Sequence, residues 1–225
     1  MDSIDTISPM NRRAMFGFAL VGLLGGVMPA SAQPHNPIAS NKWQLDFEFV
    51  DPQRVTISVP GEARPVTYWY VVYQVTNATG RDVEFFPSFR LVTDTLEVVE
   101  GGLDVNPRVY EVIATRHRQD FPFLVPPHKA SGLLLQGKEN ARASCVVFRD
   151  FDGQASAFTL FVSGLSNETD RVPNPTFMPD EPESSENPRS YVLRKTLTIR
   201  YDFPGDPQTR QTASPVRRDR VWVLR

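Results

Sequence analysis

The sequence predicts an all-β fold in which two antiparallel sheets pack together, with one short helix and long proline-rich loops. Apolar and polar residues alternate with a period of two over several segments, which is the pattern of strands with one wet face. Twenty prolines punctuate these segments. Strands do not alternate with helical patterns, so a parallel sheet built from strand-helix-strand units is not expected.

The first strands are predicted at 43–49 and 55–59. Trp43, Leu45 and Phe47 alternate with Gln44 and Asp46, and Asp46 and Glu48 belong to the acidic, solvent-facing side. The sequence Asp51-Pro52-Gln53 then turns the chain. We therefore expect these two strands to form a first hairpin.

The segment 65–89 is predicted to be a central hairpin. Both alternating sets of 68–75 are apolar, with Tyr68, Tyr70 and Val72 on one face and Trp69, Val71, Tyr73 and Val75 on the other. A strand without a polar face is covered on both sides. Asn77 and Gly80 can take left-handed backbone angles, so a turn follows. Residues 83–86 then form the returning strand until Pro87, which has no N–H to donate.

Further strands are predicted at 89–91, 95–99 and 132–136, with one helix between them. Asn106 is suited to cap the helix and Pro107 to its first turn, while Arg116, His117 and Arg118 place positive charge at its end. We expect this helix to cross between the sheets or to cover an open edge. Residues 121–127 read as an extended apolar linker.

In the C-terminal part, 145–148 and 157–162 are predicted to form a hairpin around Asp152-Gly153. The segment 166–189 is rich in proline, asparagine, serine and acidic residues, and we expect a flexible surface loop there. A long strand at 191–201 and a closing strand at 221–223 complete the pattern.

The segment 70–83, YVVYQVTNATGRDV, resembles the apolar strand and V-x-N-x-x-G turn of many bacterial extracytoplasmic immunoglobulin-like domains. The resemblance covers about one strand and its turn. It implies an immunoglobulin-like antiparallel β-sandwich and carries no catalytic residue, and this fold serves many functions.

Residues 1–32 are predicted to be a signal peptide, leaving 33–225 as one domain. Arg12 and Arg13 precede the apolar run 14–28, and Ala30-Ser31-Ala32 has the small residues that a signal peptidase reads. The run is shorter than the about 20 residues that cross a bilayer, so we expect no membrane span after cleavage. The sequence leaves open whether export is general secretory or twin-arginine and whether residues 1–9 are translated. We expect a periplasmic or extracellular protein.

The net charge limits the kinds of partner, and the cysteine content limits how the fold can be stabilised. The net charge is −2, and removal of the signal peptide takes away two arginines and two aspartates, so it does not change. This nearly neutral charge does not predict the basic surface that nucleic acid binding needs. The single cysteine excludes an intrachain disulfide, so the core has to supply the stability.

Reactive motifs are scarce, and we expect no catalytic residue, no cofactor and no metal. The candidates considered are a metal or thiol site formed by His117, His128 and Cys145, although Cys145 reads better as a buried structural thiol. The sequence Asp150-Phe151-Asp152-Gly153 begins like a calcium loop but lacks its closing glutamate, which favours a plain turn. Paired carboxylates such as Asp46 and Glu48 lie on a solvent face.

The sequence therefore favours a non-enzymatic exported protein that binds another envelope protein or has a structural role. The alternative is a carbohydrate- or peptide-binding, inhibitor-like module, which predicts an exposed aromatic row such as Tyr68, Trp69 and Tyr70, or an unpaired edge strand. A third hypothesis is a metal- or thiol-dependent enzyme. The acidic loop 169–188 suits a contact segment or a spacer, and the sequence does not indicate an oligomeric state.

Overall fold

The structure is a computed structural model that describes residues 41–103, 105–210 and 212–225. The predicted signal peptide, residues 1–32, lies outside the described residues. Among the described residues, no helix is both long enough and apolar enough to cross a membrane.

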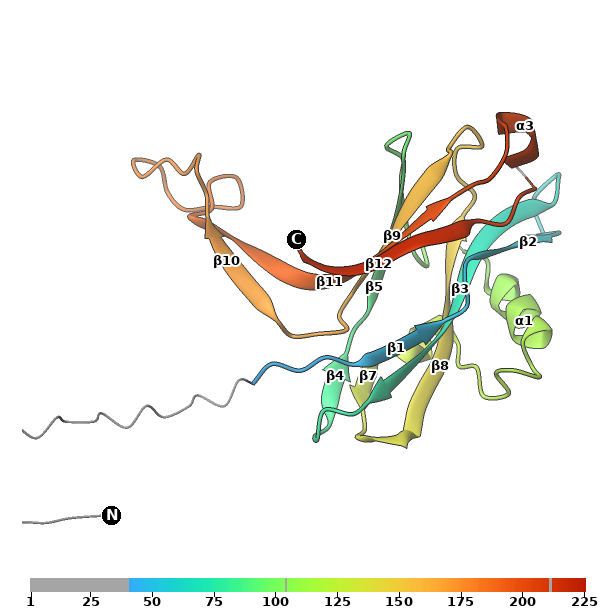
Figure 1. Ribbon diagram of the computed structural model, residues 1–225, viewed down its shortest axis with the longest axis horizontal. Helices are drawn as coiled ribbons and strands as arrows, with labels where there is room; N and C mark the ends of the chain where they lie inside the picture. The colour runs from blue at the N-terminus through green and yellow to red at the C-terminus, as the bar shows by residue number, and fades with distance from the viewer. Residues whose placement is uncertain (1–40, 104, 211) are drawn as a thin grey trace, which may run out of the picture. The chain divides into compact units, whose positions relative to one another are not determined.

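The described residues form mostly antiparallel strands, which confirms the all-β prediction (Figure 1). All pairs between the named strands are antiparallel. The elements, in chain order, are β1 (Asp46–Phe49), β2 (Gln53–Ile57), β3 (Val66–Asn77), β4 (Val83–Phe85), β5 (Ser88–Thr93), β6 (Val98–Glu100), α1 (Pro107–Arg116), α2 (Pro127–Ala130), β7 (Gly132–Leu134), β8 (Gly137–Arg149), β9 (Ala157–Ser163), β10 (Thr169–Pro173), β11 (Ser190–Asp202), α3 (Pro207–Arg210) and β12 (Val216–Leu224).

The first sheet is built around β3. Strand β8 pairs with one edge of β3, and β1 and β2 pair one after the other with the opposite edge. The N–H of Val50 donates to the carbonyl oxygen of Val72 at 2.9 Å, so the ladder continues beyond β1. Pro52 has no N–H and interrupts it. The predicted hairpin of β1 with β2 is therefore wrong, because both strands pair with β3.

The predicted central hairpin is also wrong, because β4 pairs with β7 and not with β3. Both edges of β3 are already occupied, which leaves no edge for β4. Of the two residues predicted to take left-handed backbone angles, Gly80 does so, with a φ of 85°, and Asn77 does not. The buried Asn77 holds the turn, since its amide nitrogen donates to the carbonyl oxygens of Arg81 at 2.8 Å and of Leu134 at 2.9 Å. This side chain therefore ties the end of β3 to β7.

The second sheet has the order β12-β11-β9-β5-β6, with β10 following β9 along the same edge of β11. Strand β10 corrects the prediction of a loop over 166–189, because Thr169–Pro173 pair with 190–194. Buried Asn174 and Asn187 hold the rest of this segment. Their amide nitrogens donate to the carbonyl oxygens of Pro188 at 2.8 Å and of Met178 at 3.0 Å.

The predicted hairpin of 145–148 with 157–162 does not form. Strand β8 pairs with β3, whereas β9 pairs with β5 and β11. The turn at Asp152-Gly153 therefore carries the chain from the first sheet to the second. The predicted inward set of β9, namely Phe158, Leu160 and Val162, is buried.

One core is shared by the two sheets, and a second lies on the opposite face of the first sheet. Strand β3 supplies both, which confirms that it is covered on its two faces. The shared core includes Trp69, Val71, Tyr73 and Val75 from β3, Phe148 from β8, and Leu160, Leu197, Ile199 and Tyr201 from the second sheet. The second core comprises Val55, Tyr68, Tyr70, Val72, Val109, Ile113, Cys145 and Val147.

The helix α1 covers the second core. The side chain of Asn106 accepts a hydrogen bond from the N–H of Arg108 at 3.0 Å, which confirms the predicted cap. Val109 and Ile113 face the sheet and are fully buried. The helix lies on the connection from β6 of the second sheet to β8 of the first, which agrees with the predicted crossing between sheets, and it covers a face of the first sheet rather than an open edge. The single-turn helices α2 and α3 were not predicted.

Candidate binding site

The aromatic row of β3 is not a ligand platform. Tyr68, Trp69 and Tyr70 are 4%, 3% and 1% exposed, so none of these rings is offered to a ligand. The indole N–H of Trp69 donates to Asp150 at 2.9 Å, and the guanidinium of Arg54 lies 4.6 Å from the Trp69 ring centre. The prediction of an exposed aromatic row, which a carbohydrate-binding module would need, is therefore wrong for these residues.

Asp150 and Asp152, which begin like a calcium loop in the sequence, accept hydrogen bonds that stabilise the fold. Asp150 accepts from Trp69, as described above. Asp152 accepts from the backbone N–H of Gln154 at 2.9 Å, as expected for a tight turn. The carboxylates of Asp46 and Glu48 lie on the exposed side of β1, as the alternation predicts.

Of the three candidate metal or thiol residues, two line one cavity and the third does not. His117 follows α1 and contacts Tyr70, whereas His128 and Cys145 line a cavity of which His117 is not part. In the described part of the chain, no three histidine, cysteine, aspartate or glutamate side chains are grouped so as to hold a metal ion.

A polar cluster fixes the end of α1 on the first sheet. The Tyr70 hydroxyl donates to the side-chain oxygen of Gln53 at 2.7 Å and accepts from Arg116 at 3.0 Å. It lies 3.1 Å from Nε2 of His117, so Nε2 acts as the donor of that contact. Burial and the neighbouring Arg116 lower the pKa of His117, while burial raises the pKa of Tyr70. This cluster therefore anchors the end of α1 to the first sheet.

The best candidate for a ligand site is a cavity of about 440 Å³ beside β8, which we call the β8 cavity. Its volume falls within the range of small-ligand pockets. It is lined by residues of both cores, of the segment after β6, and of α1 and α2. They are Tyr73, Pro87, Phe89, Gly101, Gly102, Val105, Asn106, Pro107, Tyr110, Pro126, Pro127, His128, Ser131, Cys145, Val146 and Val147.

The chain forms this cavity because the edge of β8 is only partly covered. The N–H of Gly102 donates to the carbonyl oxygen of Val147 at 2.7 Å. Further along, the N–H of Val125 donates to the carbonyl oxygen of Ala143 at 2.9 Å. Cys145 lies between these two attachments and contributes to the cavity wall. Prolines around both attachments cannot extend the ladder.

Four polar groups of the β8 cavity are neutral or already hydrogen-bonded. Burial raises the pKa of the Cys145 thiol to about 12, so it is not a thiolate nucleophile at neutral pH. Burial also raises the pKa of Tyr73 to about 12. The Tyr110 hydroxyl donates to the carbonyl oxygen of Leu124 at 2.5 Å, and Asn106 caps α1. The exposed His128 and Ser131 also line the cavity. The arrangement is suited to holding an apolar group and offers no activated nucleophile.

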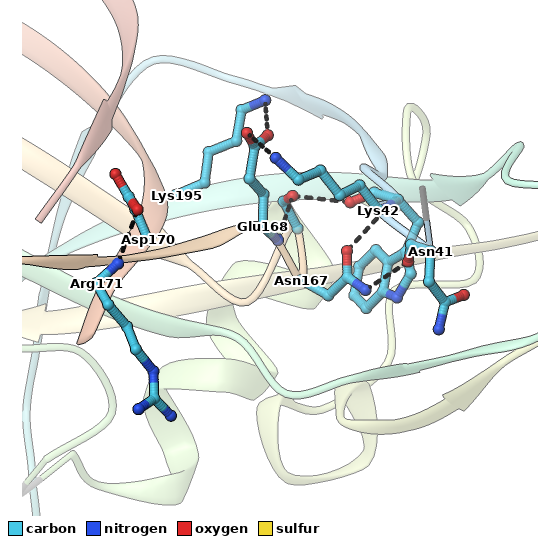
Figure 2. A network of polar contacts seen from close by, with 9 residues as sticks. Asn41, Lys42, Asn167, Glu168, Asp170, Arg171 and Lys195 are labelled. Atoms are coloured by element: carbon cyan, nitrogen blue, oxygen red, sulfur yellow. Dashed lines mark hydrogen bonds and ion pairs between the residues drawn. The ribbon is translucent and has the colours of Figure 1, made fainter. Parts of the chain in front are cut away.

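A second polar network joins the start of the described chain to the second sheet (Figure 2). Glu168 accepts from the ammonium groups of Lys42 at 2.9 Å and of Lys195 at 2.8 Å, and these two partners lower its pKa. Asn167 accepts from the N–H of Trp43 at 2.8 Å and donates to the carbonyl oxygen of Asn41 at 2.7 Å. These side chains join residues more than twenty positions apart in the sequence, so we interpret the network as a structural clamp.

Comparison with models of known families, with curated proteins and with solved structures gave no match. The function is therefore argued from the geometry. Sequence reasoning missed the β8 cavity because the cavity joins segments far apart in the chain. The one available signal was a group of prolines, of which Pro107 begins the helix and Pro126 and Pro127 end the apolar linker that follows it.

Proposed function

We propose that this chain is an exported, non-enzymatic protein with an immunoglobulin-like β-sandwich fold, which binds an apolar segment of another envelope protein in the β8 cavity. The core shared by two antiparallel sheets supports the sandwich. The signal-peptide pattern of residues 1–32 supports export. The observation that carries the binding function is the cavity itself, which is concave, aromatic and proline-lined.

An extended peptide fits the walls of the cavity better than a charged metabolite does. None of the described lining residues is aspartate, glutamate, lysine or arginine, so the cavity has no permanently charged side chain to pair with a charged ligand. The incompletely covered edge of β8 forms one wall, and strand edges accept extended chains through main-chain hydrogen bonds. Rings and prolines on the other walls provide apolar contacts for alternate side chains of such a peptide.

A photo-crosslinking amino acid placed at residue 131 tests the proposal. Ser131 is exposed and lines the cavity, so the probe lies at the mouth without replacing a core residue. The matched control is the same probe at residue 129, because Lys129 belongs to the same helical turn, is exposed and does not line the cavity. We expect position 131 to crosslink to an apolar peptide segment of an envelope protein and position 129 not to do so.

A synthetic copy of the crosslinked segment then gives the affinity by isothermal titration calorimetry. Ser131→Phe fills the mouth of the cavity and is expected to weaken binding at least tenfold, whereas Lys129→Phe leaves the affinity unchanged. Identical crosslinks from both positions, or equal affinities of the two variants, would show that the cavity is not the binding site.

The outer edge of β12 favours a second candidate function, the addition of a peptide strand. In the described part of the chain β12 pairs only with β11, so an edge of nine residues has no partner strand. Arg217, Arg218 and Arg220 lie on this strand, and charged side chains on an edge discourage pairing with other chains. We therefore rank this edge below the cavity. Arg194 and Arg225 exchange both backbone hydrogen bonds, so the N–H of the neighbouring Leu224 lies on the outer edge. Leu224→Pro removes this N–H, so it would weaken binding if the peptide pairs with β12 and would leave binding in the cavity intact.

A further inference from the structure

Three arginines surround a small hollow on the second sheet, on the face that does not contribute to the shared core. The hollow has a volume of about 160 Å³ and is lined by Ser88, Arg90, Phe161, Ser163, Arg194, Thr196 and Arg225. These residues come from β5, β9 and β11 and from the residue after β12. It shares no lining residue with the β8 cavity, so it is independent of the function proposed above.

The backbone fixes the arginines relative to one another. The N–H of Arg194 donates to the carbonyl oxygen of Arg225 at 2.7 Å, and the N–H of Arg225 donates back at 3.2 Å. The guanidinium of Arg225 lies 3.9 Å from the ring centre of Phe161, a cation–π distance. Phe161 is also the cross-strand neighbour of Arg90. The three cations are therefore held on adjacent positions of one sheet face.

The positive charge of the hollow is only partly neutralised. Nε of Arg90 pairs with the carboxylate of Glu100 at 2.6 Å, and both side chains are substantially exposed. No described residue accepts a hydrogen bond from the Arg194 or Arg225 side chain, and none of the side chains that line the hollow is acidic. The Thr196 hydroxyl donates to the carbonyl oxygen of Arg194 at 3.1 Å, and that of Ser163 to the carbonyl oxygen of Ser88 at 3.4 Å. The Ser88 hydroxyl is free to donate to a ligand.

We propose that this hollow binds a tetrahedral oxyanion, a phosphate group. Guanidinium groups recognise phosphate through paired N–H donors, and three of them from different strands suit an acceptor with more than two oxygens better than a carboxylate. The volume admits the phosphate with only a small part of whatever carries it. Free phosphate and the phosphate of a lipid headgroup share this chemistry, so the experiment has to separate these two sources.

The test is a titration of the full exported chain, followed by the NMR shifts of the Phe161 and Ser163 amides. The probes are inorganic phosphate, glycerol 3-phosphate, and vesicles with and without phosphatidic acid. Arg194→Ala is expected to weaken phosphate binding about tenfold or more, since it removes charged hydrogen-bond donors. The matched control is Arg200→Ala, because Arg200 is exposed on the same strand, pairs with Asp219 and does not line the hollow.

Glu100→Gln provides the opposite perturbation, because it releases Arg90 from its ion pair and should tighten binding. Saturable binding of the soluble probes alone identifies free phosphate or a soluble ester as the ligand, while stronger binding to phosphatidic acid vesicles identifies a headgroup. Equal weakening by Arg194→Ala and Arg200→Ala would reveal only general attraction of anions and would overturn the proposal. Absence of a saturable shift with every probe would overturn it as well.

Discussion

Asn77 offers the sharpest test of how the end of β3 is held. The substitution Asn77→Ala removes two hydrogen bonds donated to carbonyl oxygens and two accepted from the N–H and hydroxyl of Thr79, at 3.0 Å and 2.8 Å. The side chain is fully buried, and its bond to Leu134 lies in the interior, so water cannot replace it. An orphaned buried acceptor costs about 1–3 kcal/mol, and the more exposed bonds add less. We expect a loss of about 3 kcal/mol in the free energy of unfolding, by the same principle.

Asn174→Ala is the matched control for this experiment. Asn174 makes the same local pattern, since it accepts from the N–H of Thr176 at 3.0 Å and from its hydroxyl at 2.8 Å and donates to Pro188. None of these bonds lies in the interior, so the expected cost is about 1 kcal/mol. Urea unfolding followed by tryptophan fluorescence measures both variants. Equal losses for the two variants would refute the claim that the buried link to Leu134 is the stabilising contact.

Four further results are expected. The folded-state pKa of His117 lies below its ordinary value of 6.5, so the unfolded chain takes up the proton first as the pH falls. The free energy of unfolding should therefore decrease below about pH 6.5. His117→Gln should flatten this dependence in urea titrations at several pH values. Glu168 has a lowered pKa, so its contribution is present above pH 4.5 and disappears as the pH falls further; thermal melts of Glu168→Gln should show a small loss at pH 7 and none in acid. In Gly101→Ala, the new methyl group lies 2.5 Å from a methyl carbon of Val146. This clash should lower the free energy of unfolding by about 1–3 kcal/mol. Val146→Ala should restore part of the loss in the same urea assay. Cys145 should react with Ellman's reagent in denaturant and hardly at all in the native protein at pH 8, since its thiol is buried with a pKa of about 12; rapid native labelling would contradict this placement.

The strands were more predictable than their pairing. Local patterns located β3, α1 and most other elements, because apolar spacing and caps are written in neighbouring residues. The three predicted hairpins failed for a common reason. Each assumed that consecutive strands pair, whereas β3 takes partners from 46–57 and 137–149 and leaves no edge for β4. Pairing is decided by competition across the whole chain, which short segments do not reveal.

The predicted loop over 166–189 illustrates a different limit. Its polar composition indicates weak burial, but a strand edge rewards main-chain pairing whatever the side chains are. The long β11 extends beyond β9, and β10 uses that free length. Composition also gave no indication of the β8 cavity or of the arginine hollow, because both arise where distant segments meet. The burial of Cys145, in contrast, followed from its apolar neighbours in the sequence.

The position of β3 determines when this protein can fold. Its partner β8 ends at Arg149, so during synthesis a long stretch of chain has to follow β3 before its second edge can pair. Pairing between strands that are far apart in the sequence slows folding, and apolar segments stay exposed for longer. A product truncated before residue 137 would expose one unpaired edge of β3, a largely apolar strand, to other chains. Such fragments should aggregate, and a holding chaperone should capture them.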